Sequence, residues 1–101
     1  MIVILFRTRL RDDCPPSYAP LADRMLALAS AMPGFVSFRH YNASDGERIS
    51  VVEFDSADHA NAWREHPEHR EAQRRGRDEF YAWYRLQVCR QERESEFGER
   101  A

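Results

Sequence analysis

Hydrophobic positions change their spacing along the chain, and these changes predict where strands and helices alternate. Residues 1–10 begin with apolar residues on both sides of a two-residue alternation, which predicts a strand with both faces covered at its start. From Tyr18 to Met32 the apolar residues recur every three or four positions, which predicts an amphipathic helix. Pro33 and Gly34 come next, and glycine suits the position just past a helix end, so the helix is expected to stop there.

A hairpin follows this helix in the pattern. Strands are predicted over residues 35–41 and 48–54, and the Asp-Gly pair at residues 45–46 between them is a common hairpin signal. Side chains alternate between the two faces of a strand, so the spacing assigns Phe35 and Phe38 to opposite faces. The two strands are therefore expected to pair with each other in antiparallel orientation.

The most conspicuous stretch is residues 57–80, which reads as one helix interrupted by Pro67. Proline ends or kinks a helix just before itself and suits the first position of a new helix. His66 would then stand at the joint, where backbone groups lack helical partners. Ser56 or Asp58 can cap the start of this stretch.

The two helical segments and the rest of the chain differ in polarity. The first segment is expected to bury Ala57, Ala60 and Trp63, or a face close to it, whereas the mixed charges of the second are typical of a solvated face. Residues 81–92 alternate in polarity and predict a long fourth strand. Residues 94–101 are mostly polar and are expected to form a loose tail.

The predicted order is strand, helix, strand, strand, helix, strand, in one domain spanning residues 1–101. A hairpin and two helical crossovers give the split βαβ, or ferredoxin-like, α+β arrangement, which is a four-stranded antiparallel sheet with helices on one face. Large apolar residues remain on the other face and need cover. A second identical sheet related by a twofold axis would supply it, so a homodimer is expected.

Composition narrows the choice of partners and compartment. The chain has 101 residues, 43% of them hydrophobic, and a net charge of −2, which does not favour a nucleic-acid partner. Its apolar start is six residues long, far short of the about 20 that a membrane span needs, and lacks the basic leader of a secretion signal. A cytoplasmic protein without membrane contact is expected. Cys14 and Cys89 match no CxxC pattern, which favours free thiols.

Trp63 and His66 are the first candidates for a functional site. Residues three apart lie on one face of a helix, and the break at Pro67 would let His66 face a cavity. A neutral histidine near its ordinary pKa of about 6.5 suits proton removal near neutral pH. The structural alternative is that Trp63 belongs to the core and His66 caps a helix.

The histidines of this stretch also raise the possibility of a metal site. His59, His66 and His69 are the candidate ligands, but Pro67 breaks their common face. Zinc sites need three or four ligands with supporting contacts, and no acidic residue or cysteine stands at a suitable spacing. No metal is therefore expected, and because no Gly-rich phosphate loop is present either, we expect no cofactor.

Four short segments carry a family resemblance. They are MPGF at residues 32–35, the hairpin turn at residues 45–46, AWREHPEHR at residues 62–70 and the Tyr-Arg pair at residues 84–85. Together they resemble the antibiotic biosynthesis monooxygenase family, over most of the chain as far as Glu92. The resemblance implies the dimeric α+β barrel fold, which agrees with the arrangement derived above. It also implies the chemistry of characterised members, which include oxygenases that oxidise polycyclic phenols without a cofactor.

The resemblance implies a monooxygenase that acts on a small aromatic or phenolic molecule with O2. His66 and Trp63 are then the catalytic candidates. Substrate contacts are expected from six further residues, namely His59, His69, Phe38, Arg39, Tyr81 and Tyr84. Either Arg39 or Arg7 could stabilise a developing oxyanion.

Two alternatives stay open beside this interpretation. The first is a haem-degrading relative. In haem-degrading members a histidine follows the helix tryptophan by about three turns, where this chain has Gln73. In polyketide-oxidising members an asparagine precedes the tryptophan by about one turn, where this chain has His59. The same side chains could also bind an aromatic ligand without turnover, so a non-catalytic, ligand-binding or stress-related dimer is the second alternative.

Overall fold

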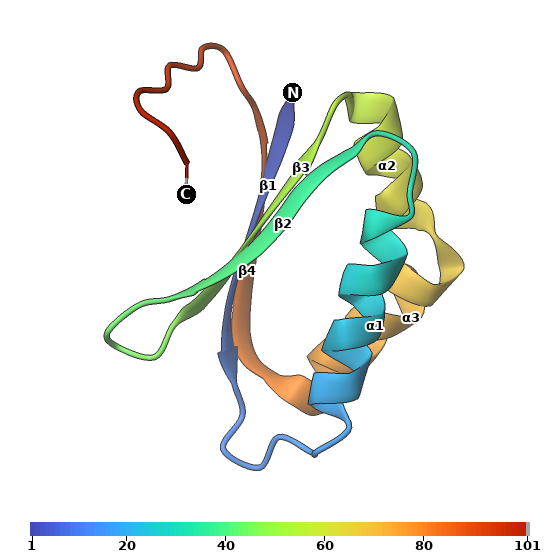
Figure 1. Ribbon diagram of the computed structural model, residues 1–101. Helices are drawn as coiled ribbons and strands as arrows, with labels where there is room; N and C mark the ends of the chain where they lie inside the picture. Colours follow the sequence, from blue (N-terminus) through green and yellow to red (C-terminus); the bar gives the residue numbers. More distant parts are fainter. Residues whose placement is uncertain (101) are drawn as a thin grey trace.

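Four strands form one antiparallel sheet in the computed structural model, which describes residues 1–100 (Figure 1). The strands β1 (Ile2–Leu10), β2 (Phe35–Asn42), β3 (Arg48–Phe54) and β4 (Tyr81–Arg90) lie in the order β2-β3-β1-β4. The helices α1 (Tyr18–Ser30), α2 (Ala57–Glu65) and α3 (Pro67–Arg75) cover one face, and a π-helical turn, η1 (Gly76–Phe80), leads into β4. The predicted α+β, ferredoxin-like fold is confirmed.

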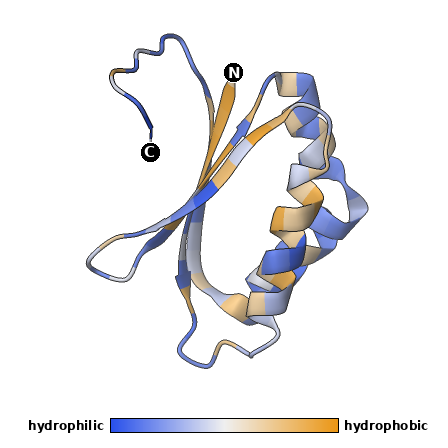
Figure 2. Ribbon diagram, viewed as in Figure 1, coloured by the Kyte–Doolittle hydropathy of each residue, from blue (hydrophilic) through white to orange (hydrophobic). Residues whose placement is uncertain are grey.

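β1 lies in the middle of the sheet, with β3 on one side and β4 on the other. Its first half is strongly hydrophobic in Figure 2, as expected for a strand covered on both sides at its start. Ile2 and Ile4 face the helices, where Ile2 is buried and Ile4 packs against the core. The alternate positions, Val3 and Leu5, face the other side of the sheet.

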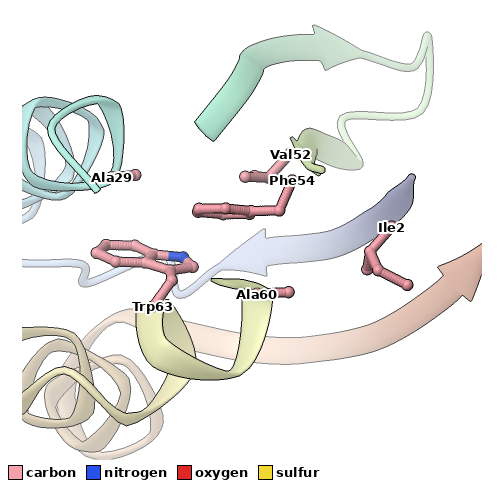
Figure 3. Close-up of a cluster of buried hydrophobic side chains, with 6 residues drawn as sticks. All are labelled: Ile2, Ala29, Val52, Phe54, Ala60 and Trp63. Carbon is pink, nitrogen blue, oxygen red and sulfur yellow. The ribbon is translucent and has the colours of Figure 1, made fainter. Parts of the chain in front are cut away.

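The core joins the sheet to α1 and α2, as Figure 3 shows. The indole of Trp63 projects from α2 toward Phe54 of β3 and Ala29 of α1. Six buried residues form this cluster, namely Ile2, Ala29, Val52, Phe54, Ala60 and Trp63. Full burial of a large apolar side chain such as Ile2, Val52 or Phe54 contributes about 1.5–3 kcal/mol to stability. These contacts therefore hold the helices on the sheet.

A β-bulge in β2 changes the faces that simple alternation predicts. Phe35 pairs with Phe54 and Ser37 with Glu53, so Val36 has no opposite residue of its own. Phe35 and Phe38 consequently both pack against the core on the helix side. The expectation that they lie on opposite faces was wrong, because one extra residue shifts the alternation.

The interruption at Pro67 is present as predicted. α2 ends at Glu65, His66 forms the joint, and Pro67 is the first residue of α3. Ser56, rather than Asp58, caps α2 by accepting a hydrogen bond from the backbone N–H of His59. Ala57 is exposed, which corrects its expected burial, because the buried face begins one turn later with Ala60 and Trp63.

The ends of several elements differ slightly from the expected bounds. α1 stops at Ser30 instead of Met32, and β4 at Arg90 instead of Glu92. Residues 91–100 form no helix or strand, and Ala101, the last residue of the expected tail, lies outside the described residues. Among residues 1–100, no helix combines the length and apolar character that crossing a membrane requires.

The sheet face turned away from the helices is here called the open face. It carries apolar residues from all four strands, namely Val3, Leu5, Val36, Tyr41, Ile49, Val51 and Trp83. Charged residues lie among them: Arg7 donates two hydrogen bonds to the carboxylate of Glu47, at 2.9 and 3.1 Å, and lies over the ring of Trp83. In the described chain no helix covers this face (Figure 1).

Candidate functional site

Trp63 forms part of the core and contacts His69 across the helix joint. Its side chain is 4% exposed, and the two rings are stacked with centroids 3.8 Å apart. His69 Nδ1 donates to the backbone carbonyl of Trp63 at 3.0 Å, since a carbonyl can only accept. Burial lowers the pKa of His69, which keeps the ring neutral. The stacked rings and the hydrogen bond therefore hold α3 against α2 across the break at Pro67.

His66 caps the second helical segment. Its Nδ1 accepts a hydrogen bond from the backbone N–H of Glu68 at 3.1 Å. In the neutral ring the hydrogen then lies on Nε2, so no lone pair is free to accept a proton while the cap is made. The geometry thus supports the capping alternative, and the catalytic role of His66 stays a prediction.

Replacing His66 with alanine should lower the free energy of unfolding by about 1 kcal/mol, because the first turn of α3 loses its cap. Chemical denaturation of both proteins measures the difference. Replacing Arg64 with alanine provides the control, because Arg64 is an exposed residue near the same joint. An unchanged stability for His66→Ala would contradict the capping role.

His59 lies at the other end of α2, away from the joint. Its Nδ1 is 2.6 Å from Oδ1 of Asp55, and the pair lies beside Gly34. Gly34 has a φ of +79°, and a Cβ there would clash with His59 Nδ1, so only glycine fits. The glycine of the MPGF segment thus makes room for the contact with Asp55 that orients His59.

The remaining expected site residues divide between the two faces of the sheet. Arg39 lies on the open face, where its guanidinium approaches the ring of Tyr41 at 6.0 Å. Phe38, Tyr81 and Tyr84 lie on the helix-facing side. Within one subunit, Arg39 and Trp63 therefore cannot line the same pocket, and their expected roles stay predictions.

Five rings form what we call the aromatic cluster, at the end of the sheet where α1 begins and η1 enters β4. Neighbouring ring centroids lie 5.3–6.0 Å apart, mostly edge to face, and the members are Phe6, Tyr18, Phe80, Tyr81 and Tyr84. A bulge in β4 pairs Tyr81 with Leu10 and Trp83 with Arg9. This shift turns both Tyr81 and Tyr84 toward the helices.

Polar side chains adjoin the aromatic cluster on the helix-facing side of the hairpin. His40 Nδ1 and the Ser50 hydroxyl are 2.9 Å apart, and Arg48 donates to the hydroxyl oxygen of Tyr18 at 3.2 Å. Burial lowers the pKa of His40, and the charge of Arg48 lowers it further against the opposing effect of Asp23. His40 is therefore neutral at neutral pH and can accept a proton.

Sequence reasoning missed this polar group, although the pattern contains a signal for it. In β2 and β3, His40, Ser50 and Arg48 occupy positions that face the helices, where a purely structural sheet would carry apolar residues. Their alternation with apolar residues reads like an ordinary half-exposed hairpin. The side of the hairpin that turns inward becomes known only from the register.

β4 leaves an uncovered apolar strip next to the aromatic cluster. α1 packs against β2 and α2 against β3, whereas Leu86 and Val88 of β4 are 46% and 61% exposed on the helix-facing side. Tyr84 continues the strip toward the cluster. An aromatic molecule could therefore contact this strip without displacing the core.

Two surface hollows lie elsewhere. One, of about 580 Å³, follows the outer side of α3 around Arg70, Arg74 and Arg77. The other, of about 450 Å³, lies on the open face beside Arg39 and Tyr41. Neither is lined by Trp63 or His66. Residues 1–100 contain no group of three or more His, Cys, Asp or Glu side chains arranged to hold a metal ion.

Comparison with known proteins identifies the family. The family model described as "Antibiotic biosynthesis monooxygenase" matches residues 1–75. The chain is also 38% identical over 90 residues to the uncharacterized protein YqjZ of Bacillus subtilis, covering 89% of this chain and 79% of YqjZ.

Solved structures show the same fold at low sequence identity. Rv0793 from Mycobacterium tuberculosis matches with a TM-score of 0.81 and 19% identity, over 94% of this chain and 98% of Rv0793. A variant of SnoaB, a cofactor-independent oxygenase from Streptomyces nogalater, matches with a TM-score of 0.77 and 13% identity, over 92% of this chain and 94% of that protein. These two likenesses concern the fold, whereas the match of the family model and the identity to YqjZ concern the sequence. The chain belongs to the antibiotic biosynthesis monooxygenase family.

Proposed function

We propose that this protein is a cofactor-independent monooxygenase that oxidises a small aromatic phenol with O2. The observation that carries the proposal is the neutral His40, held by Ser50 on the helix-facing side of the β2–β3 hairpin, beside Phe38 and diagonal to Arg48. Family membership and the fold shared with SnoaB, a cofactor-independent oxygenase, support the same reaction class. Fold alone does not fix chemistry, so the argument depends on the side chains.

The chemistry requires a base and an apolar surface. If Nδ1 of His40 donates to Ser50, the free lone pair on Nε2 can take a proton from the substrate. The resulting anion is delocalised over the aromatic rings and can reduce O2. Phe38, which packs against the core next to His40, offers apolar contact for the rings. Phe38 stacks at a tilt beside His40, with ring centroids 5.1 Å apart, and helps to hold the base.

Oxygen consumption tests the proposal most directly. The purified protein is incubated with a panel of anthrones, quinols and haem while dissolved O2 is followed. We expect uptake with an anthrone or a quinol and none with haem. Binding of these compounds without uptake would support the non-catalytic alternative, and oxidation of haem would support a haem-degrading relative.

We further propose that two copies associate through the open face into a dimeric barrel. The apolar residues of that face, including Val36 and Tyr41, need cover from water. Replacing Val51 with arginine at the centre of the face should therefore convert a dimer into a monomer, because the charge would be buried in the interface. Sedimentation of both proteins at the same concentration measures the effect. A wild-type monomer at micromolar concentration would contradict the proposal.

A further inference from the structure

α3 is the least deeply anchored helix of the structure. α1 and α2 both contribute buried side chains to the core, whereas α3 contains no buried residue. Its half-buried positions include no large apolar side chain, namely His69, Ala72, Gln73 and Arg75. Burial of apolar surface is the main force that holds a helix on a domain. The position of α3 therefore depends on a few specific contacts.

The contact between His69 and Trp63 is the main one of these. The two rings lie 3.8 Å apart at an angle of 13°, and His69 Nδ1 donates to the backbone carbonyl of Trp63. The other contacts are polar and exposed: Arg24 of α1 donates two hydrogen bonds to the carboxylate of Glu68, and Arg75 donates one to the N-cap residue of α1. Exposed ion pairs contribute little because water screens them. The stacked rings are therefore the contact whose loss would free α3.

The docked ring of His69 suits the neutral form of the side chain. Nδ1 carries the hydrogen that is donated to Trp63, so Nε2 of the neutral ring carries only a lone pair. Protonation would place a second N–H on Nε2, but within residues 1–100 Nδ1 is the only nitrogen of this ring that forms a hydrogen bond. A charge on a partly buried ring also loses hydration. Acid therefore favours a conformation in which the ring is in water.

The surrounding groups supply no counter-ion for a charged ring. Burial lowers the pKa of His69 most, the charge of His66 at the joint lowers it further, and the hydrogen bond to the Trp63 carbonyl opposes both. Arg64 and Glu65, at the end of α2, are exposed to solvent. The charged side chains that join α3 to α1 and η1 are already in ion pairs, namely Arg24–Glu68, Arg74–Asp78 and Arg75–Glu79.

We propose that His69 is an acid-sensitive latch, and that its protonation releases α3 from α2 and exposes the ring of Trp63 to water. α3 then pivots about its far end, where Gly76 and Phe80 of η1 remain buried. This inference goes beyond the proposed function and does not depend on it.

The direction of the pH dependence follows from the two states of the ring. The closed form holds His69 neutral, whereas in the open form the ring has its ordinary pKa of about 6.5. The open form therefore binds the proton more tightly than the closed form. The closed form is fully favoured above about pH 6.5, and it loses stability as the pH falls from there toward the lower pKa of the docked ring.

Hydrogen exchange of the backbone amides tests the latch on the unmodified chain. Each exchange rate is divided by the intrinsic rate of the same amide at the same pH, which leaves the opening equilibrium. One proton is taken up on opening, so the opening of the amides of residues 70–75 should increase by up to about tenfold for each pH unit below 6.5. The amides of β1, at the centre of the sheet, should show no comparable increase. An equal increase in β1, or none in α3, would overturn the inference.

Two variants identify the group that titrates. His69→Phe keeps a flat ring that can stack on Trp63 but takes up no proton, so the opening of α3 should become independent of pH. His66→Asn is the matched control, because asparagine keeps an acceptor for the helix cap and does not titrate. Its pH dependence should remain that of the wild type. A pH dependence that persists in His69→Phe would overturn the latch, and its disappearance in His66→Asn instead would assign the effect to the cap of α3.

Direct titration of the His69 ring by NMR keeps the test decisive if His69→Phe fails to dock α3. In the wild type the carbon-bound protons of this ring should titrate below pH 6.5, because the docked ring resists protonation. A measured pKa of 6.5 or above, as expected for a cation stabilised over the indole, would overturn the inference whatever the variants show.

Discussion

Replacing Trp63 with alanine is expected to lower the free energy of unfolding by about 3–5 kcal/mol, the cost of truncating a buried aromatic side chain. The indole is 4% exposed and lies among Phe54, Ala29 and Ala60. Its removal leaves a cavity that small neighbours such as the two alanines cannot fill. It also removes the stacking partner of His69, so α3 loses one of its contacts with α2.

Denaturant titration measures this loss. The transition is followed by circular dichroism rather than tryptophan fluorescence, because the variant lacks one of the two tryptophans. Phe97→Ala provides the control, because that aromatic side chain is fully exposed in the tail. Its replacement should change the stability by less than about 0.5 kcal/mol. Equal stability of Trp63→Ala and Phe97→Ala would mean that Trp63 is not part of the core.

Replacing His40 with alanine should reduce the turnover of a substrate found in the O2-uptake panel by about 10²–10⁴-fold, which is the usual contribution of a general base. The reduction is expected in kcat, because the base acts after the substrate is bound. The fold should be retained, since His40 is not part of the core cluster. Ser50→Ala should give a smaller reduction, because Ser50 orients the imidazole and does not itself take the proton.

His66→Ala provides the decisive comparison for this assignment. If His40 is the base, His66→Ala loses stability and keeps its rate. If His66→Ala loses the rate while His40→Ala keeps it, the base is His66, as the sequence analysis expected. Measuring melting temperature and kcat on both variants separates a folding effect from a chemical one.

The sequence carried enough information for the order of elements because each signal is local. The spacing of apolar residues before Met32, the Asp-Gly turn and Pro67 each act within a few residues. The cap at His66 was foreseen as one of two alternatives for the same reason. Helix ends were missed by up to two residues, since the last turn depends on tertiary contacts.

The rest of the candidate site depends on contacts between distant segments. Arg48 meets Tyr18 across 30 residues, and His40 meets Ser50 only because of the strand register. The spacing of hydrophobic residues does not show which side of the β2–β3 hairpin faces the helices. The bulges in β2 and β4 add to the difficulty, because each reverses the alternation on which a prediction of faces is built.

The bulge in β2 has a consequence for comparing this protein with its relatives. Val36 and Ser37 together oppose Glu53, so the loss of Val36 alone would leave every other pair of the β2–β3 ladder intact. A relative shorter by one residue here can keep the same sheet and the same inward row. Insertions and deletions during evolution should therefore be tolerated at this point, and an alignment needs a gap after Phe35 before the position equivalent to His40 can be found.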